Sequence, residues 1–263
     1  MKTSGRALLR AAHLGPALAV TGLSCLLAVA ADLDVVTVVK VTAAVLAGQL
    51  SVGWSNDLRD RARDTAVGRG DKPLATGELS VTVALAACAV AIVATVVLSF
   101  ACGLRAGSVH LLCVASAWTY NLWLKASVLS WLPYAVSFGA LPVFVSLAGA
   151  SWPPVEVVVG AALLGVGAHL LNVVPDLADD AATGVRGLPH RLGARASTVL
   201  AVALLVGATV VLLVTGDPGA VLAVTGAVAV AGLAGLALIG TGRAPFHSAI
   251  GIALVDVAIL VLR

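Results

Sequence analysis

The sequence predicts an all-α, polytopic membrane protein. We expect about nine transmembrane helices in a single bundle, forming one domain over residues 1–263 around a polar cavity open to the cytoplasmic side. Two observations predict this class. Hydrophobic residues make up 60% of the chain and charged residues only 11%, whereas an ordinary soluble domain carries roughly 25% charged residues. Apolar stretches of about 20 residues, each long enough to cross a bilayer, recur from end to end.

Charged or Pro/Gly-rich breaks divide the chain into the predicted spans. The first begins in MKTSGRALLRAAHLGPALAVTGLSCLLAVAAD, which resembles a secretory signal peptide with Ala28-Val29-Ala30 as a cleavage-like site. We expect a retained first helix instead, because the apolar run is long for a signal peptide. The nine spans cover residues 11–31, 35–55, 79–102, 107–124, 130–149, 155–175, 197–215, 218–240 and 245–262.

Two connections between spans are long and polar, residues 56–78 and 176–196. Each follows an even-numbered span, so both emerge on the same side as the N-terminus. All of the 16 Lys and Arg residues except Lys40, Arg105 and Arg263 lie in the N-terminus, in these two loops or in turns on that side. The positive-inside rule therefore places the N-terminus and both loops in the cytoplasm of an integral protein of the plasma or inner membrane.

The first polar loop opens with the acidic stretch SNDLRDRARD. Asn56, Asp60 and Asp64 are spaced i, i+4, i+8, which places their side chains in one strip on a helix, with Asp57 beside it. Such a cluster repels itself unless a cation is present. Mg²⁺ is the expected ion, because it takes one or two carboxylates, keeps waters and accepts phosphate oxygens of a substrate.

A second acidic cluster follows the sixth span. Asp176 and Asp180 repeat the i, i+4 spacing, with Asp179 alongside. Two such clusters facing each other could hold a diphosphate through Mg²⁺ ions. The alternative is that both clusters are solvated helix ends whose acids pair with neighbouring arginines. Matching spacing on one side of the membrane favours a binding site, because charges at a membrane boundary in an otherwise uncharged chain mark a functional site.

Basic and polar residues beside the acids are candidates for holding the phosphate groups. Arg69 and Lys72 follow the first cluster, and Arg186 and Arg191 follow the second. Arginine can grip a phosphate through two parallel hydrogen bonds. The alternative is simple topology, since cytoplasmic loops are basic whatever they bind. Asn172 shares a face of the sixth span with Asp176 and is a further candidate.

These motifs resemble those of a known family. The pattern Asn56-Asp57-x-x-Asp60-x-x-x-Asp64, followed by GRGDKPLATGELS, is similar to the first aspartate-rich motif of the UbiA-type intramembrane prenyltransferases. Residues 172–193, NVVPDLADDAATGVRGLPHRLG, look like the second motif. The resemblance extends over the whole chain, including the number of spans and the position of each motif after spans two and six.

The resemblance implies a bundle of nine helices that joins an isoprenoid diphosphate to an acceptor, often an aromatic ring, with Mg²⁺ as cofactor. Quinone or lipid precursors are the expected acceptors, and no nucleic-acid partner is expected. Asp57, Asp179 and the diphosphate itself are alternatives for taking the proton that the acceptor loses. Carried over by position, the Mg²⁺–diphosphate ligands are Asn56, Asp60, Asp64, Asp176 and Asp180, the diphosphate-binding residues include Arg69 and Lys72, and Tyr120 and Lys125 lie near the diphosphate.

Other functions are possible for a chain of this composition. A cyclase without an acceptor, or a lipid-glycerol prenyltransferase, would use the same fold. A CDP-alcohol phosphotransferase is disfavoured because no Asp-Gly precedes the acids and the two clusters lie far apart. A transporter would place paired acids within broken spans, whereas Asp256, Glu156 and Lys40 are scattered and unpaired in sequence.

Overall fold

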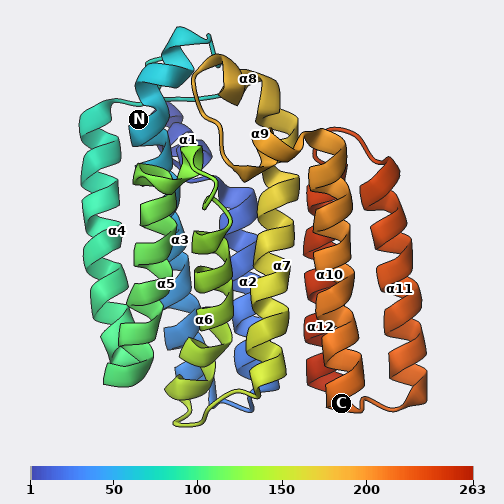
Figure 1. Cartoon of the computed structure of the whole chain (residues 1–263). Helices are drawn as coiled ribbons and strands as arrows, with labels where there is room; N and C mark the ends of the chain where they lie inside the picture. Colours follow the sequence, from blue (N-terminus) through green and yellow to red (C-terminus); the bar gives the residue numbers. More distant parts are fainter. Residues whose placement is uncertain (1, 263) are drawn as a thin grey trace.

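The structure is a computed structural model that describes residues 2–262; Met1 and Arg263, the two ends of the predicted domain, lie outside the described residues. Throughout that range the regular elements are helical, and the long helices stand side by side in one bundle (Figure 1). The helices are α1 (Lys2–Ala11), α2 (Leu14–Ala30), α3 (Val35–Ala66), α4 (Val81–Ala101), α5 (Leu104–Leu122), α6 (Leu132–Ala148), α7 (Val155–Val173), α8 (Leu177–Ala182), α9 (Leu188–Leu192), α10 (Ala194–Gly216), α11 (Ala220–Ile239) and α12 (Ala244–Leu262), with 3₁₀ turns η1 (Leu124–Ala126) and η2 (Val174–Asp176).

The nine predicted spans correspond in order to α2 to α7 and α10 to α12. Within the described residues, six helices are long and apolar enough to cross a membrane: α3, α4, α7 with its continuation to Ala182, α10, α11 and α12. The pair α1 and α2, bent by 69° at its break, would be a seventh, and α6 is apolar but has only 17 residues. The all-helical membrane class is thus confirmed, and nine crossings remain a prediction.

Helix α3 carries the first acidic cluster well beyond its apolar part. Asp34 is the N-cap of this helix. Its side chain accepts hydrogen bonds from the backbone N–H groups of Val36 and Thr37 and so satisfies unpaired donors of the first turn. The 32 residues of α3 extend about 48 Å at 1.5 Å per residue, whereas the hydrocarbon core is about 30 Å thick. The predicted span ended at residue 55, but the helix continues without a break through the acids to Ala66.

The two long connections lie at the same end of the bundle. Figure 1 shows residues 67–80, in cyan, close to η2, α8 and α9, in gold, with the N-terminus at this end and the C-terminus at the other. This agrees with the predicted arrangement of loops and termini relative to one another. The assignment of this end to the cytoplasm stays a prediction.

Small residues let α7 approach its neighbours closely in the middle of the bundle. A Cβ added to Gly165 would lie 2.6 Å from Phe138 Cβ on α6, and one added to Gly167 would lie 2.8 Å from Leu205 Cγ on α10. Membrane helices pack closely through such residues. Helix α7 is thereby held against both neighbours, which fixes the position of the second acidic cluster at its end.

Candidate active site

A cavity of about 430 Å³ runs through the bundle. At the end of the two long loops its wall is polar and charged, and further in it is formed by apolar side chains such as Leu23 of α2, Leu141 of α6 and Leu212 of α10. This volume is in the range of small-molecule binding sites. Of the predicted site residues, the cavity wall contains Asn56, Asp60, Asp64, Arg69, Lys72, Tyr120, Lys125, Asn172, Asp176 and Asp180.

The first acidic cluster forms the predicted strip on α3. Asn56, Asp60 and Asp64 line the cavity, whereas Asp57 does not, because adjacent residues of an α-helix point about 100° apart. Asp60 is buried, and its Oδ2 accepts hydrogen bonds from Lys125 Nζ at 2.7 Å and from Arg63 Nη2 at 2.7 Å.

The second acidic cluster lies where α7 gives way to η2 and α8. Pro175 has no backbone N–H, so it cannot continue the α-helical hydrogen bonds, and the chain tightens into a 3₁₀ turn that contains Asp176. Asp176 and Asp180 both line the cavity. The side chain of Asp179 is 62% exposed and is not part of the cavity wall.

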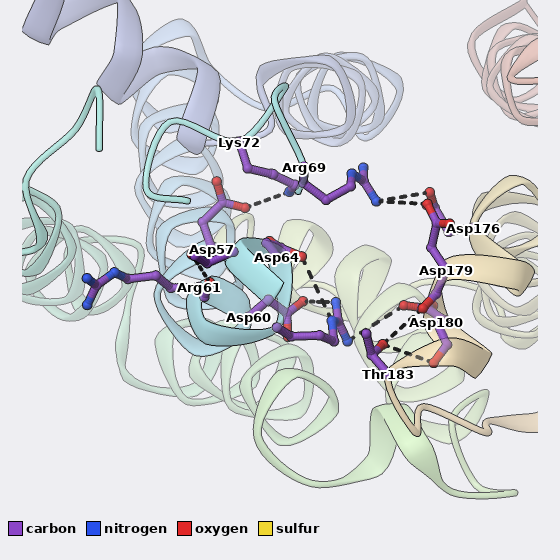
Figure 2. Close-up of polar contacts among 12 residues, drawn as sticks. Asp57, Asp60, Arg61, Asp64, Arg69, Lys72, Asp176, Asp179, Asp180 and Thr183 are labelled. Carbon is purple, nitrogen blue, oxygen red and sulfur yellow. Dashed lines mark hydrogen bonds and ion pairs between the residues drawn. The ribbon is translucent and has the colours of Figure 1, made fainter. Parts of the chain in front are cut away.

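Arginines join the two clusters, although Asp64 and Asp176 are 112 positions apart in the sequence. Arg63, on α3, places Nη1 3.6 Å from Asp180 Oδ1 while Nη2 holds Asp60. Arg69, in the loop after α3, places Nη1 3.6 Å from Asp176 Oδ1, and Figure 2 shows it extended toward Asp176 and Asp179. The clusters therefore face each other across a narrow gap that holds both carboxylates and guanidinium groups.

Asp71 fixes the orientation of Arg69. It accepts hydrogen bonds from Arg69 Nε at 2.9 Å and Nη2 at 3.0 Å, which leaves Nη1 directed toward the second cluster. The guanidinium lowers the pKa of Asp71 to about 2. The pair therefore stays ionised at neutral and mildly acidic pH. Arg69 binds Asp71 through Nε and Nη2 and directs Nη1 toward the site.

Asp57 forms an ion pair with Lys72 and lies outside the cavity wall. Its side chain is 1% exposed, and its Oδ1 lies 2.7 Å from Lys72 Nζ and 2.7 Å from His13 Nε2. Lys72 Nζ lies 3.0 Å from His13 Nε2 and itself lines the cavity. This placement suits Asp57 to hold the ammonium group of Lys72 in position, whereas the sequence suggested it as a proton acceptor.

An aromatic group adjoins the charged end of the cavity. Tyr120 and Tyr134 line the wall and meet edge to face, with ring centroids 5.1 Å apart. His169 is fully buried behind them, its ring 4.5 Å from that of Tyr134, and its Nε2 lies 3.1 Å from Ser130 Oγ. Lys125 follows in the short turn η1, so the predicted Tyr120–Lys125 pair does lie beside the first cluster.

Two predicted diphosphate ligands are not brought to the cavity. Arg186 and Arg191 are exposed and are not part of its wall. In contrast, the sequence indicated no site role for His13 or Tyr134, and it suggested Arg63 only as a neutralising partner of nearby acids. A signal for Arg63 existed, because it is spaced i+3 from Asp60, but nothing in the sequence linked it to Asp180.

The acidic residues suit Mg²⁺ but not a metal held by protein ligands alone. Within residues 2–262, no group of three or more His, Cys, Asp or Glu side chains could hold a metal ion unaided. Mg²⁺ does not need one, because it is usually bound by one or two carboxylates together with waters and substrate phosphates. The oxygen-only donor set of Asp60, Asp64, Asp176 and Asp180 fits that requirement.

The fold and this site define a helical membrane protein with an apolar cavity that has paired charges at one end. A model of the UbiA prenyltransferase family matches residues 16–245, so the chain belongs to this family. No curated protein sequence matches it.

Several solved structures share the fold. A UbiA homologue from Archaeoglobus fulgidus bound to GPP and Mg²⁺ superposes with a TM-score of 0.76 at 15% identity, covering 97% of this chain and 98% of that one. A UbiA homologue from Aeropyrum pernix K1 without ligand has a TM-score of 0.76 at 16% identity, with 98% of each chain covered. A structure described as digeranylgeranylglyceryl phosphate synthase has a TM-score of 0.68 at 16% identity and 99% coverage of each chain.

Proposed function

We propose that this protein transfers an isoprenoid group from a prenyl diphosphate to a small aromatic acceptor within the membrane, releasing diphosphate and using Mg²⁺. The observation that carries the proposal is the meeting of the two acidic clusters at the charged end of one cavity, with Arg63 and Arg69 between them. Such a gap suits a diphosphate head group bound with Mg²⁺, and the apolar remainder of the cavity suits an isoprenoid chain.

The proposed Mg²⁺ ligands are Asn56, Asp60, Asp64, Asp176 and Asp180, all of which line the cavity. When bound, Mg²⁺ would neutralise charge that develops on the departing diphosphate. The homologues from Archaeoglobus fulgidus that bind GPP or DMAPP together with Mg²⁺ support this choice of cofactor and donor.

The chain's own cations would hold the diphosphate and stabilise it as it leaves. Arg69, Lys72 and Lys125 line the cavity, and Asp71, Asp57 and Asp60 respectively fix their charged ends. Fixed cations in a site shielded from water stabilise a leaving anion without having to reorganise during the reaction. The apolar wall would keep water from an allylic cation formed at the chain's first carbon.

The aromatic side chains support an aromatic acceptor. Tyr120 and Tyr134 form part of the cavity wall, where the exposed part of each ring could pack against a flat acceptor or stabilise a carbocation. For the proton that the acceptor loses, the diphosphate is the best-placed base, because Asp57 is tied to Lys72 and Asp179 is largely exposed outside the cavity wall.

An in vitro screen tests the proposal. Purified protein in lipid nanodiscs is incubated with Mg²⁺, prenyl diphosphates of several lengths and candidate acceptors, and products are identified by mass spectrometry. Prenylated aromatic product with stoichiometric diphosphate supports it. Diphosphate released with a cyclic hydrocarbon and no acceptor would indicate a cyclase, and transfer only to a glycerol phosphate lipid would indicate the lipid-forming reaction. No diphosphate release with any pair would contradict an enzymatic role.

A further inference from the structure

One charged side chain in the cavity has no part in the proposed reaction. Asp256 of α12 is 1% exposed and belongs to the cavity wall. It lies 12 residues after the first residue of α12, Ala244, which is about 18 Å along the helix axis at 1.5 Å per residue. Because α12 runs from the end of the long loops toward the opposite end of the bundle (Figure 1), Asp256 lies in the apolar half, away from the acidic clusters.

The hydrogen bonds of Asp256 account for only one of its two oxygens. Oδ1 accepts from Thr209 Oγ1 of α10 at 2.7 Å, a bond between two membrane helices of the kind that helps them pack. Oδ2 is buried and has no hydrogen-bond partner among the described residues. A buried polar atom left unpaired is costly, and the helix–helix bond would need only one acceptor oxygen.

The surroundings of Asp256 do not suit a trapped water. The cavity-lining residues on either side of it along α12, Ala253, Val257 and Leu260, are all apolar. A buried water usually needs two to four polar partners, whereas Asp256 is the one polar side chain among the described cavity-lining residues of α12. A polar group carried by a bound molecule is the better match, because the apolar wall would bind the rest of that molecule.

We infer that Asp256, held on its other oxygen by Thr209, forms a hydroxyl-binding subsite in the deep half of the cavity. A hydroxyl is the group that fits, because it can both donate and accept a hydrogen bond and so can pair with a carboxyl group in either protonation state. This inference rests on the proposed function, since it takes the cavity to be the binding place of the isoprenoid chain and its acceptor.

The hydroxyl could come from either substrate. An isoprenoid whose diphosphate lies at the acidic clusters would extend its tail into the deep half, so a hydroxyl near the end of that tail could reach Asp256. Alternatively, the acceptor itself could enter the cavity and place a phenolic or alcoholic hydroxyl there. The chemistry of recognition is the same in both cases, and matched pairs of ligands separate them.

The test measures dissociation constants for the full-length protein in nanodiscs with Mg²⁺. One pair of probes is farnesyl diphosphate and its derivative with a hydroxyl on the terminal isoprene unit; the other is 4-hydroxybenzoate and benzoate. We expect the wild-type protein to bind the hydroxylated member of one pair at least about tenfold more tightly, as a hydrogen bond to a buried charged or polar group allows. The pair that shows the preference identifies the source of the hydroxyl.

Variants assign the preference to Asp256. Asp256→Val should abolish it while leaving affinity for the unhydroxylated member within about threefold, and Asp256→Asn should retain much of it, because an amide can still donate to the hydroxyl oxygen. Thr209→Val is the matched control for the helix–helix bond and should keep the preference. A purely structural role for Asp256 predicts instead that the Thr209→Val and Asp256→Val proteins lose thermal stability alike and that neither changes selectivity.

Two results separate the inference from the proposed function. If the wild-type protein shows no preference in either pair while farnesyl diphosphate still binds in a Mg²⁺-dependent manner, the subsite is wrong and the proposed function stands. This comparison needs no variant, so it holds even if a substitution prevents folding. If neither diphosphate binds with Mg²⁺ dependence, the proposed function fails, and the benzoate pair still decides whether the subsite exists.

Discussion

Asp57 offers the sharpest test of how the site is built, because two roles for it predict different kinetics. In the structure it lies outside the cavity wall and holds Lys72 Nζ at 2.7 Å, with His13 completing the contact. If Asp57 acts by positioning Lys72, then Asp57→Asn should lower kcat/KM for the prenyl diphosphate. If it is the base that takes the acceptor's proton, then it should act on turnover whether or not Lys72 is present.

The size of the effect follows from the burial of this contact. The side chain of Asp57 is 1% exposed and that of Lys72 is 13% exposed, so solvent screens their attraction little. A hydrogen bond to a charged group contributes about 1.5–3 kcal/mol, which corresponds to roughly a 10- to 100-fold loss in kcat/KM at 1.4 kcal/mol per factor of ten. We expect a loss in this range for Asp57→Asn.

The assay is a double-mutant cycle of Asp57→Asn and Lys72→Met, measured by diphosphate release in nanodiscs. A positioning role predicts that the double variant is no worse than Lys72→Met alone, since there is then no ammonium group left to position. Circular dichroism checks that each variant keeps its helices. Losses that simply add would refute the reasoning and would return Asp57 to the role of proton acceptor.

The remaining predictions concern the metal, the acids and the packing of the first helices. Asp60→Ala or Asp176→Ala should abolish turnover while leaving the protein inserted and folded; near wild-type rates at saturating Mg²⁺ would show that these carboxylates do not hold the metal. Chelation with EDTA should stop diphosphate release, and added Mg²⁺ should restore it, without loss of helical circular dichroism in between. Gly53→Ala should lower the free energy of unfolding by about 1–3 kcal/mol through overpacking, because the added Cβ would overlap the backbone carbonyl of Ala12. Gly207→Ala, where an added Cβ meets nothing within 4 Å, is the control and should not destabilise; equal effects on the melting temperature would contradict the close approach at Gly53.

The sequence was sufficient to predict those parts of the site that depend on helical periodicity. The i, i+4, i+8 spacing of Asn56, Asp60 and Asp64 predicted one strip, and the structure places all three on the cavity wall. Counting the spans predicted that both loops lie at one end of the bundle, because each loop follows an even-numbered span. The length of the helix was harder to predict: the predicted span stops at residue 55, before the acidic cluster, whereas α3 continues through the acids to Ala66.

Contacts between distant segments could not be predicted in this way. The contact of Asp57 with His13 depends on the left-handed backbone of His13 at the break between α1 and α2, with φ of 53°, and no local pattern links residue 13 to residue 57. Likewise, Arg186 and Arg191 follow the second cluster in sequence, but the loop leaves them exposed. Proximity along the chain predicted their role, whereas the path of the loop determines what they can reach.

The guanidinium groups between the two acidic clusters also bear on how a ligand enters. Arg63 lies between Asp60 and Asp180, and Arg69 lies close to Asp176, so arginines of the first segment attract carboxylates of the second. If a metal-bound diphosphate binds here as proposed, the carboxylates would exchange arginine for the metal, and the arginines would pair with phosphate. Because the metal and the diphosphate carry opposite charges, binding them together would change the local charge at the membrane boundary less than binding either one alone.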